Sequence, residues 1–154
     1  HGLSLGCGVA LVSKRTGQAF RAFVQLSDGE CDEGSTWEAI LFAPHHRLDN
    51  LVAIVDYNKI QSFGTVKEVL DLEPLADKWR AFGWAVREID GHDHGQIHAA
   101  LKSVPLAPGR PSAIIAHTVK GKGVSFTENQ LAWHYKAPND EQLAAALAEL
   151  GGPA

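Results

Sequence analysis

The chain has 154 residues, of which 45% are hydrophobic and 21% charged, a composition typical of one globular domain with a buried core. Its 14 basic and 18 acidic residues give a formal net charge of −4, which argues against the basic surface stripe of a nucleic-acid-binding protein. The sequence contains no membrane-spanning apolar run, no signal-peptide pattern and only two cysteines, Cys7 and Cys31, so we expect a cytoplasmic protein without a disulfide framework or a membrane anchor.

The sequence begins with His1 and contains no methionine. A complete gene product would start with methionine. We therefore expect residues 1–154 to form a single domain that is incomplete at its N-terminus.

Hydrophobic periods typical of helices and of strands alternate along the chain. In chain order, the predicted elements are a helix over 3–13, a strand over 20–27, a helix over 34–43, a strand over 50–56, a helix over 74–82, a strand over 84–89, a helix over 94–103, a strand over 112–119 and a helix from about 140. This alternation predicts an α/β fold, a doubly wound and mainly parallel sheet with helices on both faces.

Two predicted helices carry recognisable boundary residues. Ser35 or Thr36 is the expected N-cap of the 34–43 helix, and Pro44 is expected to end it. Asp93 is expected to cap the helix that follows it.

Polar residues follow the carboxyl ends of two predicted strands that one helix connects. Asp28 and Gly29 come after the 20–27 strand, and Asn58 comes after the next strand. In a right-handed βαβ unit both loops open into one crevice, where α/β sheets bind their ligands. The Asp28 carboxylate, the Asn58 amide oxygen and a nearby carbonyl such as that of Ile60 would suit Mg²⁺ together with phosphate oxygens and water. Gly29 would let the backbone approach a diphosphate closely.

Motifs spread over nearly the whole chain resemble those of transketolases, which depend on thiamine diphosphate. Ser27-Asp28-Gly29 with Asn58 is similar to the thiamine-diphosphate motif, GDG followed further along by Asn, although Ser27 replaces the first glycine. The other matching segments are His1–Gly6 (the end of GSLGxGLS), Glu33–Ala39 (EGxxWEA), Asp90–Asp93 (DGHD), Thr118–Gly123 (TxKGxG) and Trp133-His134 (WH).

The resemblance implies how the cofactor would be held. Asp28, Asn58 and the Ile60 carbonyl would bind Mg²⁺ or Ca²⁺, and Gly29 would contact the diphosphate of thiamine diphosphate. Two further residues are implied in cofactor binding: Lys120, as a charge near the diphosphate, and His92, which would line the cofactor edge.

The resemblance also implies catalytic roles and a partner. His134 would face the reacting centre and stabilise an oxyanion or move a proton. Glu33 would lie at a subunit interface, near the partner glutamate that activates the cofactor. No stretch resembles the pyrimidine-binding domain that carries this glutamate, so a C-terminal transketolase subunit is expected as partner, in a homo- or hetero-oligomer.

The implied activity is transfer of a two-carbon ketol unit from a ketose, such as a sugar phosphate, to an aldose. Two alternatives stay open at this point. The chain could belong to another thiamine-diphosphate enzyme, of the 1-deoxyxylulose-phosphate synthase or keto-acid dehydrogenase E1 type, or it could be a non-catalytic binding subunit of the same fold.

Other reactive residue types have plainer explanations. His92, His94 and His98 lack a fourth ligand for zinc. His117 lies within a predicted strand, where hydrogen bonds are expected to satisfy it. Cys31 is surrounded by acidic residues, which would raise its thiol pKa and argue against a nucleophile.

Overall fold

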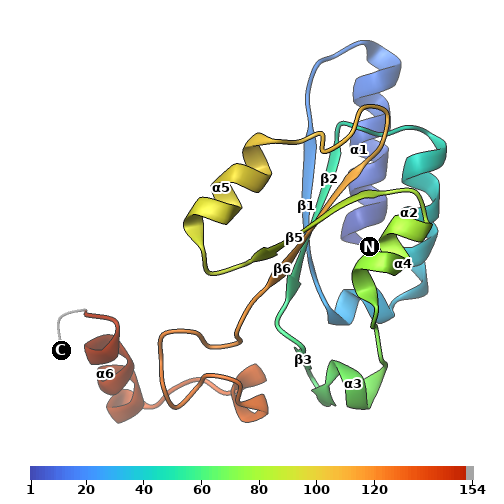
Figure 1. The fold of residues 1–154 in the computed structure, drawn as a ribbon. Helices are drawn as coiled ribbons and strands as arrows, with labels where there is room; N and C mark the ends of the chain where they lie inside the picture. The colour runs from blue at the N-terminus through green and yellow to red at the C-terminus, as the bar shows by residue number, and fades with distance from the viewer. Residues whose placement is uncertain (152–154) are drawn as a thin grey trace.

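The computed structural model describes residues 1–151 and contains a parallel sheet with helices on both faces (Figure 1). In chain order the elements are α1 (Gly2–Thr16), β1 (Ala22–Ser27), the 3₁₀ helix η1 (Gly29–Asp32), α2 (Gly34–His45), β2 (Leu51–Tyr57), β3 (Ile60–Gln61), β4 (Gly64–Thr65), α3 (Val66–Val69), α4 (Leu75–Ala81), β5 (Ala85–Asp90), α5 (His94–Lys102), β6 (Ser112–His117), the 3₁₀ helix η2 (Leu131–His134) and α6 (Asp140–Glu149). The last three residues of the domain predicted over 1–154 lie outside this description. Among the described helices, none is long and apolar enough to cross a membrane.

The main sheet has the strand order β1-β2-β6-β5, and every neighbouring pair is parallel. Ser27 pairs with Asp56 and Tyr57 pairs with His117, so β1, β2 and β6 end at one edge of the sheet. The predicted doubly wound α/β architecture is therefore confirmed, and its ligand-binding edge is the one at which these strands end.

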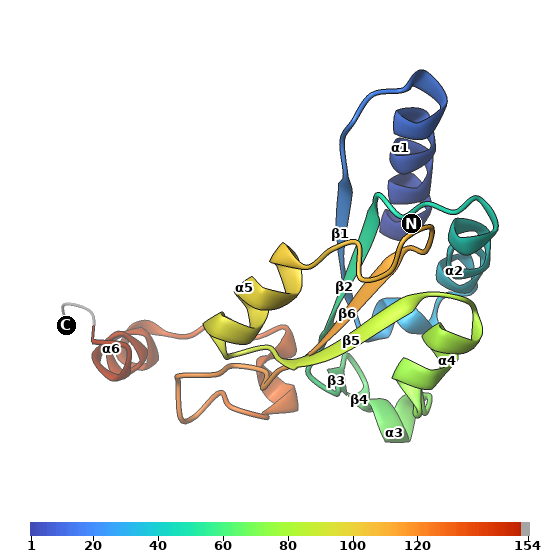
Figure 2. The same cartoon turned by 45° about the horizontal axis from the view of Figure 1, so that its top comes forward.

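The apolar run of β2 is explained by burial on both of its faces. Leu51, Ala53 and Val55 belong to the core formed with α1, α2 and α4. Val52 and Ile54 point to the opposite side and pack with residues of α5. Figure 2 shows these helices on the two sides of the sheet. Because successive side chains of a strand alternate between faces, a strand between two helix layers is apolar throughout.

Both ends of α2 differ from the expected ones. The N-cap is Glu33 rather than Ser35 or Thr36, and its carbonyl accepts a hydrogen bond from the Thr36 N–H at 3.0 Å. Pro44 does not end the helix but lies inside its last turn.

Pro44 leaves one carbonyl of α2 without its helical donor. A proline has no N–H, so the Ile40 carbonyl four residues earlier receives no backbone hydrogen bond from it. The indole N–H of Trp84 donates to this carbonyl instead, at 2.8 Å, and Trp84 is fully buried. A side chain from the segment that leads into β5 therefore completes the hydrogen bonding of α2.

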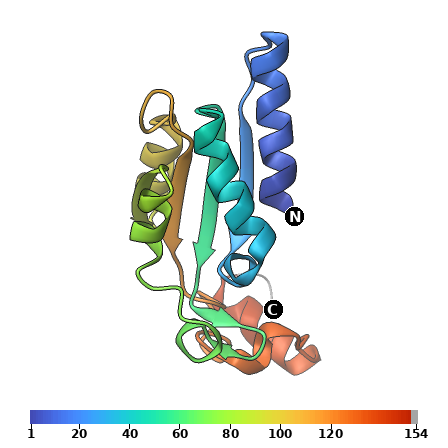
Figure 3. The ribbon, with the colours of Figure 1, turned by 90° about the vertical axis from the view of Figure 1, so that its right-hand side faces the viewer.

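The segments beyond the strand ends contain structure that the sequence pattern does not predict. The stretch between the strand predicted over 50–56 and the helix predicted over 74–82 contains the short antiparallel pair β3–β4. Figure 3 shows the arrowheads of β2 and β6 pointing toward this pair and toward the C-terminal segment. The predicted C-terminal helix is confirmed as α6, capped by Asn139, but it buries none of its residues. Asp93 caps α5 as expected, accepting hydrogen bonds from the Gly95 and Gln96 N–H groups.

Replacing Trp84 by phenylalanine should destabilise the fold by leaving the buried Ile40 carbonyl unsatisfied, at a cost of about 1–3 kcal/mol for the missing hydrogen bond. Urea unfolding followed by circular dichroism measures this loss. In a Pro44→Ala background, the new backbone N–H can serve the Ile40 carbonyl, so Trp84→Phe should cost less there. Equal losses in the two backgrounds would contradict this explanation.

Candidate active site

A cavity of about 520 Å³ lies beyond the carboxyl ends of β1, β2 and β6, and we call it the strand-end pocket. Its wall includes Asp28, Gly29 and Glu33 after β1, Asn58 and Ile60 after β2, and Lys120 and His134 after β6. Three loops thus meet because their strands are neighbours in the sheet. The loop after β5 does not join them, because β6 separates β5 from β1 and β2.

His92, which follows β5, is the one predicted site residue that does not line the strand-end pocket. Its Nε2 accepts a hydrogen bond from the Val119 N–H at 2.7 Å. His92 therefore holds the backbone immediately before Lys120.

Asp28 is a buried carboxylate, with 2% of its surface exposed. Its Oδ2 accepts a hydrogen bond from the Lys59 N–H at 2.7 Å. Burial raises the pKa of Asp28; the N–H groups of Lys59 and Gly29 lower it, and the charges of Asp56 and Asp32 raise it further. No basic side chain within residues 1–151 forms an ion pair with it. A carboxylate that is buried among like charges and lacks a cationic partner fits a bound cation.

Asn58 brings its amide oxygen to the same site through a tight turn. Its Oδ1 accepts a hydrogen bond from the Ile60 N–H at 3.0 Å, and Lys59 between them has a left-handed φ of 68°. The candidate donors are thus one carboxylate, one amide oxygen and one main-chain carbonyl. Such a set suits Mg²⁺ or Ca²⁺ rather than zinc. No cluster of three or more His, Cys, Asp or Glu side chains is found in the described part of the chain.

The strand-end pocket has an acidic wall, formed by Asp28, Glu30, Asp32 and Glu33, and among residues 1–151 Lys120 is its one lysine. This excess of negative charge would repel a free diphosphate and favours a diphosphate bound to a divalent cation.

Ser27, the departure from GDG, fits its position. The Ser27 N–H and hydroxyl both donate to Glu30 Oε2, at 2.8 and 3.1 Å. The Glu30 N–H in turn donates to the Ser27 hydroxyl at 3.3 Å. This reciprocal pair closes the first turn of η1, so the serine stabilises the loop that carries Asp28.

Cys31 and His117 behave largely as expected. Burial is the main cause that raises the pKa of the Cys31 thiol to about 12, and the neighbouring acidic residues contribute less. The expected direction is confirmed, whereas the expected main cause, negative charge, is corrected to burial. His117 Nε2 lies 3.2 Å from Glu88 Oε2, which provides the expected hydrogen bond.

Enclosed polar atoms belong to the predicted His134 and to two pocket residues that no sequence pattern indicated, Asp32 and Gln61. Within residues 1–151, Asp32 Oδ1, Gln61 Nε2 and His134 Nδ1 are enclosed, and all three residues line the strand-end pocket. The Gln61 side chain lies close enough to Asp32 to lower the pKa of that carboxyl, against the raising effect of its burial. His134 Nδ1 has no such neighbour within residues 1–151, and because an unmade buried hydrogen bond costs about 1–3 kcal/mol, it favours a polar ligand at this place. Gln61 and the neighbouring Ser62 lie at the end of the two-residue strand β3, in a segment without hydrophobic period, so the sequence gave no signal for them.

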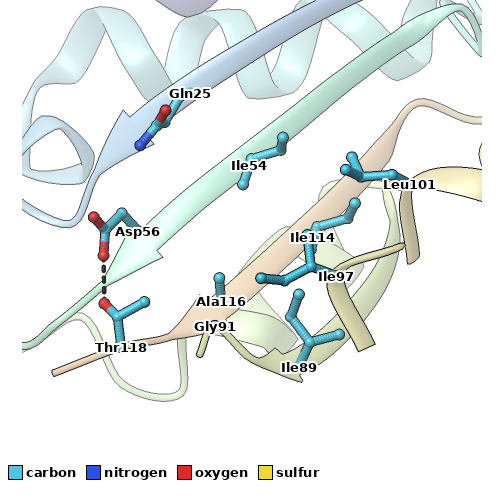
Figure 4. Close-up of a pocket in the computed structure, with 10 residues that line it drawn as sticks. All are labelled: Gln25, Ile54, Asp56, Ile89, Gly91, Ile97, Leu101, Ile114, Ala116 and Thr118. Atoms are coloured by element: carbon cyan, nitrogen blue, oxygen red, sulfur yellow. Dashed lines mark hydrogen bonds between the residues drawn. The ribbon is translucent and has the colours of Figure 1, made fainter. Parts of the chain in front are cut away.

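A second cavity, of about 320 Å³, lies on the α5 side of the sheet (Figure 4). Its apolar walls come from β2, β5, β6 and α5, and Asp56 accepts a hydrogen bond from the Thr118 hydroxyl at its polar end. This cavity contains none of the predicted site residues.

Comparison with known families adds an independent finding. Residues 15–153 match the family described as transketolase, thiamine diphosphate binding domain.

Two curated relatives are named as transketolase subunits. A 6-deoxy-6-sulfo-D-fructose transketolase subunit of Clostridium sp. (strain MSTE9) is 46% identical over 97% of this chain and 54% of its own length. An apulose-4-phosphate transketolase subunit of Phocaeicola vulgatus is 41% identical over 97% of this chain and 53% of its own length. The chain thus spans about half the length of the curated relatives it matches.

Solved structures agree with the fold. The transketolase from Campylobacter jejuni superposes with a TM-score of 0.90 and 29% identity, over 98% of this chain and 25% of that one. A transketolase from Pichia stipitis gives a TM-score of 0.88 at 23% identity, over 98% of this chain and 24% of that one, which supports the fold alone.

Removing the charge of Asp28 should not destabilise the metal-free chain. At pH 7, with a chelator present, Asp28→Asn should equal the wild type or exceed its free energy of unfolding by about 1 kcal/mol, because the amide avoids the burial of an unpaired charge. The folded-state pKa of Asp28 is raised, so ionisation opposes folding above that pKa. The advantage of the variant should therefore disappear as the pH falls toward the ordinary value of 3.8.

Chemical denaturation at several pH values measures the effect of Asp28→Asn, with the exposed Asp77→Asn as control. A large loss of stability in metal-free Asp28→Asn would show that the carboxylate serves the fold rather than a cation.

Proposed function

Because the chain belongs to the transketolase family, in the part described as the thiamine diphosphate binding domain, we propose that it forms the diphosphate-binding half of a transketolase-type active site. The observation that carries this proposal is the convergence of Asp28, Asn58 and Ile60 at one pocket. That pocket buries a carboxylate without a cationic partner.

The residues present fit a metal and a diphosphate. Asp28, Asn58 and the Ile60 carbonyl would hold Mg²⁺ or Ca²⁺, which offsets the acidic wall. Gly29 presents its backbone to open space, since an added Cβ would meet nothing closer than Gln61 Cγ at 3.8 Å. Lys120 adds a positive charge for the diphosphate. Bound thiamine diphosphate would supply the carbanion chemistry that breaks and forms carbon–carbon bonds.

Three residues would act around the cofactor. His134 would donate or accept a proton, or stabilise negative charge on a substrate oxygen. Glu33, at the start of α2, would meet the partner glutamate that activates the cofactor. His92 would act on the site through its hydrogen bond with the Val119 N–H, which supports the backbone of Lys120.

The complete activity would need a second chain in the same oligomer. We infer a partner that carries the pyrimidine-binding domain, and a cytoplasmic reaction that moves a two-carbon ketol unit from a ketose phosphate to an aldose. The names of the relatives support a second subunit and a sugar substrate, because they describe transketolase subunits and refer to a sulfonated or a phosphorylated sugar.

The test is reconstitution of the full-length protein with its candidate partner subunit. With thiamine diphosphate and Mg²⁺, the mixture should transfer a two-carbon unit from a ketose phosphate to an aldose, and neither protein should do so by itself. Product analysis with pyruvate as the competing donor distinguishes the reaction types. Products formed from pyruvate alone, or cofactor binding without any turnover, would overturn the proposal.

Gly29→Ala should separate binding from folding. The structure has room for the methyl group in the absence of ligand, so the free energy of unfolding should change by less than about 0.5 kcal/mol. The methyl group would occupy space needed by the diphosphate, so affinity for Mg²⁺–thiamine diphosphate should fall about tenfold or more, which is about 1.4 kcal/mol.

Calorimetric titration in the presence of the partner subunit measures this loss of affinity. Gly34→Ala is the matched control, because an added Cβ there meets nothing within 4 Å and Gly34 does not line the pocket. Unchanged affinity in Gly29→Ala would remove Gly29 from the cofactor site.

A further inference from the structure

Three side chains form a connected row at the strand-end pocket. Ser62 lies between β3 and β4, His134 ends η2, and Tyr135 follows it. The Tyr135 hydroxyl donates to Ser62 Oγ at 2.6 Å, and Ser62 Oγ lies 3.2 Å from His134 Nε2. The rings of His134 and Tyr135 meet edge to face, with centroids 4.7 Å apart. The contact joins segments that are 72 and 73 positions apart in sequence.

The direction of these hydrogen bonds follows from the chemistry of the two hydroxyls. A phenol is far more acidic than an aliphatic hydroxyl, with an ordinary pKa of about 10, so Tyr135 is the better donor of the pair. Ser62 has a single hydroxyl hydrogen. Since its oxygen accepts from Tyr135, that hydrogen is available for His134 Nε2.

A ring nitrogen that accepts a hydrogen bond carries no hydrogen, so neutral His134 must then carry its hydrogen on Nδ1. His134 Nδ1 is also the nitrogen that is enclosed and has no hydrogen-bond partner within residues 1–151. The row therefore ends in an N–H donor that lacks an acceptor, on a side chain that lines the strand-end pocket.

We propose that Ser62 and Tyr135 are positioning residues that select the Nδ1–H tautomer of His134 and hold that N–H for an acceptor oxygen of a bound ligand. The acceptor is an oxygen of the diphosphate or of the sugar substrate. This assignment of the acceptor rests on the proposed function, whereas the choice of tautomer does not.

The tautomer can be measured without cofactor or partner. In the ¹⁵N-histidine-labelled chain at a pH of about 8.5, above the ordinary titration range of histidine, long-range ¹H–¹⁵N correlation spectra identify the protonated nitrogen. A His134→Gln variant assigns the resonances. We expect Nδ1–H in the wild type and a shift toward the Nε2–H form in Ser62→Ala.

Variants that keep part of the row separate positioning from general structural damage. Ser62→Thr keeps the hydroxyl and should restore the Nδ1–H tautomer, and Tyr135→Phe should give an intermediate mixture. Ser125→Ala, which removes a hydroxyl that donates to Glu149, is the matched control and should change nothing. A wild-type Nε2–H tautomer, or a Ser62→Ala spectrum equal to the wild type, would overturn the proposal.

Kinetics of the reconstituted two-chain enzyme identify the acceptor. Ser62→Ala should lower kcat/KM roughly tenfold, as is typical when a hydrogen bond that orients a functional side chain is lost, and Ser62→Thr should recover it. A weaker apparent affinity for thiamine diphosphate would indicate the diphosphate as acceptor, and a change confined to the ketose kinetics would indicate the substrate. Unchanged kinetics despite an altered tautomer would overturn the positioning role. A wild-type enzyme without transferase activity would refute the proposed function and leave the tautomer result standing.

Discussion

The hydrogen bond from the Lys59 N–H to the Asp28 carboxylate is the contact on which the site depends. It joins the loop after β1 to the loop after β2, across 31 positions of sequence. The parallel register that pairs Ser27 with Asp56 makes the contact possible, because it ends both strands at the same level. The same turn gives Lys59 a left-handed backbone and directs the Asn58 amide oxygen to the Ile60 N–H. The strained backbone of Lys59 thus fixes the positions of two candidate metal ligands, Asp28 and Asn58.

The composition of the strands was enough to predict the parallel sheet. It could not predict which loops meet at the pocket, because that depends on the order of the strands in the sheet. The apolar run of β2 and the polar residues after it indicate a buried parallel strand whose loop binds a ligand. His92 and Lys120 both follow strands, and no local pattern separates them. Only the order β1-β2-β6-β5 does so, since it places β6 next to β2 and β5 on the far side of β6. Strand order is decided by pairings between distant segments, which short stretches of sequence do not reveal.

Local patterns also miss contacts that a distant segment completes. Pro44 predicts the end of a helix, but α2 continues to His45. Trp84 supplies the hydrogen bond that the proline cannot make. Strands β3 and β4 have two residues each, too few for any alternation to be recognised. Ser62 and Tyr135 meet across 73 positions, so neither residue alone suggested a role.

The strand-end pocket is incomplete in two complementary ways. Its acidic wall, with the buried Asp28, needs positive charge, whereas the enclosed Nδ1 of His134, in the proposed tautomer, needs an acceptor oxygen. A metal ion alone would neutralise the acidic wall but would offer no acceptor oxygen to the enclosed nitrogen. A free diphosphate would offer acceptor oxygens, but the acidic wall would repel its negative charge. A divalent cation bound to a diphosphate meets both needs at once. The charge balance of the pocket and the unpartnered nitrogen of His134 are therefore two physical reasons for the same class of ligand, and neither depends on the similarity to transketolases.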